Sequence, residues 1–147
     1  MASLKNFCIK KMSVLVLVLG KDALTREAIL YNLELSGYHA VGFEDGSHAF
    51  RALSGIKFNV LIMSASHTYP SEYELLRQAK KIQPNLRTIL VDGAPPNEVA
   101  IPYVDAFVQR PFGMNSIHDA LKRVLCHQQQ SVPLQAWTGH LQSSAIH

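Results

Sequence analysis

The chain has 147 residues, of which 48% are hydrophobic and 17% are charged. This is enough apolar material for the core of one globular domain, which excludes a largely disordered or collagen-like protein. The net charge of +3 is mild and the basic residues are scattered, so we expect no nucleic-acid partner. Two cysteines, Cys8 and Cys126, lie at opposite ends; they form no disulfide framework, and a cytoplasmic location is expected.

Residues 1–12 are interpreted as an N-terminal lead-in, and residues 13–127 as one domain. The apolar run over 13–19 leads into Gly20, Lys21 and Asp22, without the small-residue cleavage pattern of a signal peptide. It is also too short to span a bilayer. We therefore expect a first buried strand here and no membrane partner.

Strands and helices are expected to alternate along the domain. Hydrophobic runs bounded by turn residues predict strands over 13–19, 38–43, 58–64, 87–91 and 106–108. Helical periodicity predicts helices over 24–36, 47–55, 70–83 and 115–127, with a short helix over 97–101 because Pro102 follows. The residues expected to face the core are Leu24, Ala28, Ile29, Leu33, Ala49, Phe50, Leu53, Tyr73, Leu76, Ala79, Ile82, Ile117, Leu121, Val124 and Leu125.

The alternation predicts an α/β fold with a parallel sheet and helices on both of its faces. The run over 58–64 has no polar alternation, which is typical of a central strand. Because open α/β sheets bind ligands at the carboxyl ends of their strands, we expect any site near Ser64. Residues 128–147, rich in Gln and Ser, are interpreted as a largely disordered tail, in which Trp137 is an exposed aromatic.

In order and spacing, five segments resemble the CheY-like receiver domain of bacterial response regulators. They are Val14-Leu-Val-Leu-Val-Leu-Gly-Lys-Asp22, Leu35-Ser-Gly-Tyr-His-Ala-Val41, Glu44-Asp-Gly-Ser-His-Ala49, Phe58-Asn-Val-Leu-Ile-Met-Ser64 and Val108-Gln-Arg-Pro-Phe112. The resemblance implies a flavodoxin-like (βα)5 fold, doubly wound, with a five-stranded parallel sheet in the order 2-1-3-4-5. It also implies a role in two-component or phosphorelay signalling.

Active receivers carry an acidic pair, a phosphoacceptor aspartate, a hydroxyl residue and a lysine, which together hold Mg²⁺ and an acyl phosphate. In this chain the acidic pair falls on Gly20 and Lys21, and the phosphoacceptor falls on Ser64. The hydroxyl position is Asp92 and the lysine position is Arg110. The resemblance therefore implies a degenerate site in which Mg²⁺ and ordinary phosphotransfer are not expected.

Only Asp22, just beyond the pair, keeps an acidic side chain on the first loop. We hypothesise that Asp92 pairs with Arg110 or Lys21, and that the Lys21 ammonium fills the place of the metal. Phe107 stands where active receivers keep a switching aromatic, and it is interpreted here as a core or edge aromatic because its hydroxyl partner is absent. The Arg110–Pro111 bond is a candidate cis peptide, as in the family.

Other chemistries have weaker support. Ser64 and His67 suggest a nucleophile and a base, but no oxyanion-hole motif surrounds them. The histidines form no metal-binding motif, and Gly20-Lys21-Asp22 lacks the glycines of a nucleotide-binding loop. Arg77, Lys80 and Lys81 are interpreted as the solvated face of a helix. We therefore expect neither an enzyme nor a zinc site.

The sequence thus predicts a stand-alone pseudo-receiver that acts through protein contacts. The expected surface is residues 95–127, which the family uses for dimers and effectors, so the partner is another protein, a second copy, or both. An alternative is a sensor of a small anion or ligand, with a pocket formed by Lys21, Ser64, Asp92 and Arg110. A fragment of a longer regulator is a third possibility.

Overall fold

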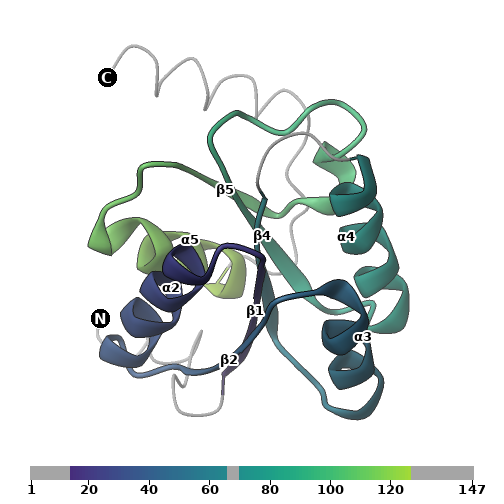
Figure 1. Cartoon of the computed structure of the whole chain (residues 1–147), viewed down its shortest axis with the longest axis horizontal. Coiled ribbons are helices and arrows are strands. Elements are labelled where there is room, and N and C mark those ends of the chain that lie inside the picture. Colours follow the sequence, from purple (N-terminus) through teal and green to yellow (C-terminus); the bar gives the residue numbers. More distant parts are fainter. Residues whose placement is uncertain (1–13, 66–69, 127–147) are drawn as a thin grey trace.

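The computed structural model describes residues 14–65 and 70–126, and these form one α/β unit (Figure 1). The predicted lead-in over 1–12, the tail over 128–147, His67 and Trp137 lie outside the described residues. The strands are β1 (Leu15–Gly20), β2 (His39–Phe43), β3 (Val60–Ser64), β4 (Arg87–Asp92) and β5 (Ala106–Gln109). The helices are α2 (Ala23–Leu35), α3 (Gly46–Gly55), α4 (Pro70–Ile82) and α5 (Met114–Cys126), with a 3-10 turn η2 (Ile101–Tyr103).

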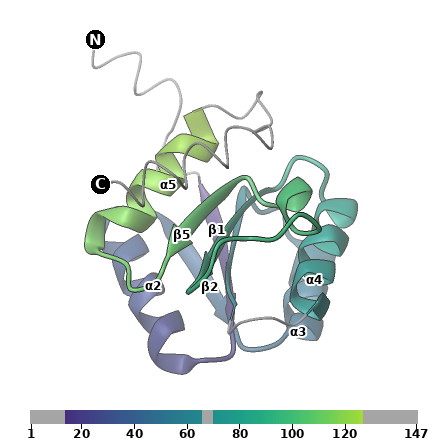
Figure 2. The ribbon, with the colours of Figure 1, turned by 90° about the horizontal axis from the view of Figure 1, so that it is seen from above.

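All five strands are parallel and lie in the order β2-β1-β3-β4-β5, so the predicted topology is confirmed. Helices α2 and α5 cover one face of the sheet, and α3 and α4 cover the other (Figures 1 and 2). Every residue of β3 is buried, as expected of a central strand with helices on both sides. The edge strand β2 is more exposed.

Alternate residues of each strand face opposite sides of the sheet, which divides the core into two clusters. Val16, Val18, Val60 and Ile62 belong to the cluster under α2 and α5. Leu17, Leu61 and Leu90 belong to the cluster under α3 and α4; the two clusters therefore share one sheet as their common wall.

Local signals in the sequence set the helix ends. Asp22 caps α2 by accepting a hydrogen bond from the Thr25 amide at 3.0 Å, and Asp45 caps α3 by accepting one from the His48 amide at 3.0 Å. After α2, Gly37 has φ 91°, a left-handed conformation in which glycine has no Cβ to clash. The Tyr38 amide then donates back to the Leu33 carbonyl at 3.0 Å, which closes the helix.

One sequence prediction about the elements is wrong. No helix forms over 97–101; a turn leads instead into η2, which contains Pro102 near its start. The described residues therefore contain four α-helices and the short 3-10 turn η2. Proline fits the first turn of a helical segment, because it lacks only an amide that would have no partner there.

Three residues assigned to the core are exposed. Leu24 and Ala28 lie on the outer side of α2, whereas Ile29 and Leu33 of the same helix are buried. Ile82, at the end of α4, is 40% exposed. The predicted inward residues of α5 are all buried. Among the described residues, no helix is long and apolar enough to cross a membrane.

Candidate functional site

Four of the predicted site residues meet at the carboxyl edge of the sheet. Gly20 ends β1 and lies in register with Ser64, which ends β3. Asp92 ends β4, and Arg110 directly follows β5. Since parallel strands end at the same edge, the fold brings together residues that are up to 90 positions apart in the sequence (20 to 110).

Asp92 and Arg110 form an ion pair, as hypothesised. The Asp92 Oδ1 atom lies 3.6 Å from Arg110 Nη2, and the Asp92 side chain is only 3% exposed. The same Oδ1 accepts a hydrogen bond from the Gly93 amide at 2.6 Å. The Arg110 amide donates to the Asp92 carbonyl at 2.8 Å. A nearly buried carboxylate is thus supplied with both a counter-ion and a backbone donor, as burial requires.

The Arg110 guanidinium also connects β5 to β3. Its Nη2 donates to the carbonyl of Ala65, the residue directly after Ser64. The Ala65 amide in turn donates to the Val91 carbonyl at 2.8 Å. The Arg110–Pro111 peptide bond is cis, which agrees with the expectation from the resemblance. One cation therefore connects the ends of three strands.

Gly20 and Ser64 approach each other closely. A Cβ atom added at Gly20 would lie 3.0 Å from the Ser64 Cβ, which is tighter than normal packing allows. The Ser64 side chain is buried, with only 6% of the residue exposed. At the first position of the acidic pair there is accordingly no carboxylate, and a side chain there would fit beside Ser64 only if Ser64 shifted.

The remaining acid of the first loop, Asp22, serves as a helix cap. Its Oδ2 accepts hydrogen bonds from the amide and the hydroxyl of Thr25. The Thr25 hydroxyl bond lowers the pKa of Asp22 most, and the charge of Arg110 makes a smaller contribution in the same direction. Arg26 fixes the loop further by donating to the Gly20 carbonyl at 2.6 Å.

These residues do not fit the magnesium site of active receivers. Positions 20 and 64 carry no carboxylate, Asp92 is paired with Arg110, and Asp22 caps α2. No group of three or more His, Cys, Asp or Glu residues that could hold a metal ion occurs over 14–65 and 70–126. Lys21 is exposed, and its placement where the metal would bind remains a prediction.

Phe107 is part of the apolar core. It is 6% exposed and belongs to the apolar cluster under α3 and α4, which also contains Ala100 and Val104. This position agrees with the interpretation of Phe107 as a core aromatic. Its ring contributes to packing between β5 and the segment around η2.

The sequence analysis did not predict a polar network at the amino ends of β4 and β5. Lys80 Nζ lies 2.7 Å from Asp105 Oδ2 and donates to the Leu86 carbonyl at 3.1 Å. Asp105 Oδ2 also accepts from the Thr88 amide at 2.9 Å. The prediction that Lys80 belongs to a solvated face is therefore wrong. Its partner is 25 residues away, and no local spacing could have indicated it.

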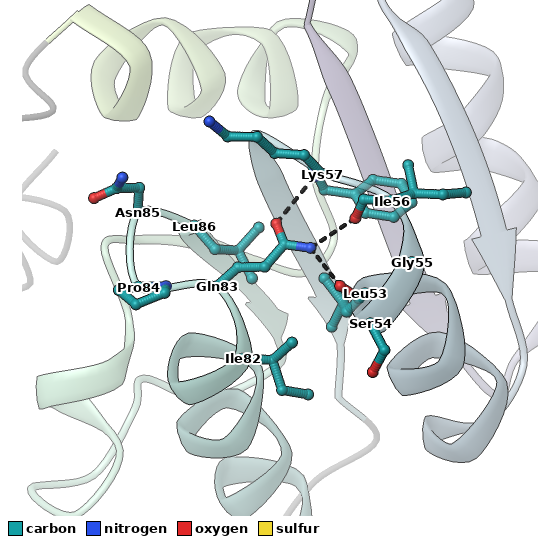
Figure 3. A pocket seen from close by; sticks show the side chains of 11 residues that line it. Leu53, Ser54, Gly55, Ile56, Lys57, Ile82, Gln83, Pro84, Asn85 and Leu86 are labelled. Atoms are coloured by element: carbon teal, nitrogen blue, oxygen red, sulfur yellow. Dashed lines mark hydrogen bonds between the residues drawn. The ribbon is translucent and has the colours of Figure 1, made fainter.

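A pocket among the described residues also lies away from the predicted site. It has a volume of about 360 Å³ and lies between the ends of α3 and α4. Gln83 crosses it: Oε1 accepts from the Phe58 amide at 3.0 Å, and Nε2 donates to the Leu53 and Ile56 carbonyls at 2.7 Å each (Figure 3). The polar groups at its centre thus satisfy one another, which indicates a structural connection between two helices.

Known proteins resemble this chain more extensively in fold than in sequence. No model of a known protein family matches the chain. A response regulator receiver protein, CpdR of Brucella abortus, is 28% identical over 78 residues, which are 53% of this chain and 65% of the relative. The match thus spans less than two thirds of that relative's length.

Solved structures match a larger part of the chain. A CheY-like receiver domain protein from Methanospirillum hungatei is 20% identical with a TM-score of 0.68, over 79% of this chain and 96% of that one. The chemotaxis response regulator CheY4 of Vibrio cholerae is 16% identical with a TM-score of 0.70, over 78% of this chain and all of that one (100%). The fold is therefore a doubly wound α/β sheet of the flavodoxin type. More narrowly, the chain has the CheY-like receiver fold of response regulators.

Proposed function

We propose that the chain is a pseudo-receiver in two-component or phosphorelay signalling, and that it acts by binding protein rather than as an enzyme. The observation that carries this proposal is the pairing of Asp92 with Arg110 beside Ser64 and Gly20. The receiver fold supports a signalling role, and the curated relative is a receiver protein. A cytoplasmic location is part of the same proposal.

The chemistry of the site explains why phosphorylation on aspartate is not expected. An acyl phosphate needs a carboxylate, and Ser64 offers only a hydroxyl. The charge that would neutralise a phosphoryl group is that of Arg110, which is already engaged by Asp92 and the Ala65 carbonyl. These contacts hold the strand ends in one arrangement that does not depend on an added phosphate.

Residues 95–127 are the proposed partner surface. Pro95, Val99 and Pro102 are exposed, and Val99 exposes 71% of its area. Ala100 and Val104 anchor the segment in the core, and the Ala100 amide donates to Asn97 Oδ1 at 2.9 Å. An exposed apolar side chain on a firmly held turn is a suitable contact for another protein.

The site proposal is tested with acetyl phosphate and Mg²⁺, followed by intact mass measurement and thermal unfolding with and without Mg²⁺. We expect no phosphoryl adduct and no metal-dependent shift in the unfolding temperature. An active receiver treated in the same way is the positive control. A stable adduct on the wild-type chain would contradict the proposal, and loss of the adduct in a Ser64→Ala variant would locate it.

The surface is tested by comparing partner capture from a lysate of the source cells by the wild type and a Val99→Asp variant. A Val41→Asp variant is the matched control, because Val41 is also exposed, at 41%, but lies on β2 at the other edge of the sheet. We expect Val99→Asp to lose specific partners that Val41→Asp retains. The alternative, a sensor of small anions, is less favoured because Arg110 already has an anionic partner.

A further inference from the structure

Helix α2 carries an apolar stripe on the side that faces away from the sheet. Leu24, Tyr31 and Leu35 are 82%, 62% and 58% exposed, and Ala28 between them is exposed as well. The spacing of four, three and four residues places all of them on one side of a helix. The opposite side, with Ile29 and Leu33, is buried against the sheet.

This stripe, which comprises Leu24, Ala28, Tyr31 and Leu35, differs from ordinary scattered exposure. Single exposed apolar residues need no explanation. Here they extend over the whole helix at the spacing of a helix–helix seam. Helices α2 and α5 form the layer that covers one face of the sheet (Figure 2). The stripe on α2 is separate from the surface proposed at residues 95–127.

The order of large and small residues along the stripe is self-complementary. If a second α2 packs antiparallel about a twofold axis between Ile29 and Leu30, Leu24 lies opposite Leu35 of the second copy. In the same arrangement Ala28 lies opposite Tyr31 of the second copy, so that the largest side chain meets the smallest. A parallel pair would place Tyr31 against Tyr31 and Ala28 against Ala28, which packs less evenly.

We propose that two copies of this chain associate through the stripe as an antiparallel α2 pair. Such an interface is isologous, because the same surface serves on both copies. A helix of 13 residues is only about 20 Å long, so the buried area is at the low end for specific complexes and the dimer is weak. We therefore expect self-association that depends strongly on concentration.

The flanks of the stripe make this proposal specific. Thr25 and Asn32 lie along one flank, and Glu27 and Glu34 lie along the other. In an antiparallel pair about a twofold axis, like flanks meet, so Glu27 approaches Glu34 of the second copy. This like-charge contact weakens the pair and can be reversed by a single substitution.

The main experiment is sedimentation equilibrium on the full chain from about 10 µM to about 1 mM, a range suited to weak association. We expect reversible dimerisation that Leu35→Glu abolishes and that Glu27→Lys strengthens several-fold at low salt. Val41→Glu is the matched control and should leave dimerisation unchanged. Circular dichroism of each variant establishes that it is folded. A chain that stays monomeric over the whole range, with Glu27→Lys also monomeric, would overturn the proposal.

Orientation is tested with single cysteine variants under oxidising conditions. A mixture of Leu24→Cys and Leu35→Cys chains should form the linked 24–35 peptide, identified by mass spectrometry, whereas Leu24→Cys alone should form no 24–24 link. A predominant 24–24 link would indicate a parallel pair and refute the antiparallel arrangement. If the thiol introduced by Leu24→Cys is protected from alkylation to the same extent at every concentration, the chain covers its own stripe, which also refutes the proposal.

Discussion

Asp92 is held by two donors of different kinds, the guanidinium of Arg110 and the amide of Gly93. Replacing it by alanine leaves the Gly93 amide without this acceptor, and leaves the Arg110 guanidinium with the Ala65 carbonyl but without its counter-ion. We expect Asp92→Ala to lower the free energy of unfolding by about 1–3 kcal/mol, measured by urea denaturation. Asp92→Asn keeps an oxygen for the Gly93 amide and should lose less. Unchanged stability and unchanged hydrogen exchange in the adjoining loops would contradict the proposed network.

The contact between Gly20 and Ser64 allows a second test at the residue scale. Gly20→Ala adds a Cβ atom 3.0 Å from the Ser64 Cβ, and such overpacking costs roughly 1–3 kcal/mol. Ser64→Gly removes the opposing atom. Gly20→Ala should therefore cost less stability in the Ser64→Gly background than in the wild type. Thermal and chemical unfolding measure both effects. Additive losses in the double variant would show that the two positions do not compete for space.

At the scale of elements, Gln83 joins the end of α4 to the end of α3 and to the segment before β3. Gln83→Leu leaves the Phe58 amide and the Leu53 and Ile56 carbonyls without this partner. We expect a loss of about 1–3 kcal/mol in unfolding free energy and faster hydrogen exchange of the Phe58 amide. Gln83→Glu keeps the acceptor for Phe58 but not the donor, so it should preserve protection at Phe58 better than leucine does.

The cap of α3 predicts a pH dependence. The His48 amide first, and then the His48 and Ser47 side chains, lower the pKa of Asp45 from 3.8 to about 2. Because the pKa is lower in the folded state, the ionised cap contributes stability that is present above pH 3.8 and is lost as the pH falls towards about 2. Asp45→Asn retains a capping side chain and should remove this part of the acid dependence. An identical acid profile in the variant would contradict the assignment.

At the scale of the whole molecule, the two core clusters share one sheet. Leu121 belongs to the cluster under α2 and α5, and Leu76 belongs to the one under α3 and α4. Each is fully buried, so Leu121→Ala and Leu76→Ala should each cost about 2–5 kcal/mol.

Because neither face has a core of its own without the shared strands, we expect one unfolding transition in both variants. Circular dichroism and residue-resolved hydrogen exchange should report the same midpoint on both faces. Separate transitions for α2–α5 and for α3–α4 would show that the faces unfold independently.

The sequence by itself determined the strands, their parallel arrangement and the inward face of α5, because long apolar runs and a single helical stripe allow one interpretation. The meeting of Ser64, Asp92 and Arg110 also followed from strand ends and from the resemblance. The sequence did not determine which face of α2 points inward, since that helix has apolar residues on two sides. Leu24 and Ala28 face outward and Ile29 and Leu33 face inward, a choice that depends on packing against the sheet.

Only the tertiary structure revealed contacts between distant residues. The pairing of Lys80 with Asp105 and the Gln83 connection join segments 25 to 30 positions apart, for which local periodicity carries no signal. The replacement of the predicted helix over 97–101 by η2 was decided in the same way, by the burial of Ala100 and Val104 on either side of an exposed Pro102. Local patterns specify elements, whereas long-range packing decides which of their faces and charges meet.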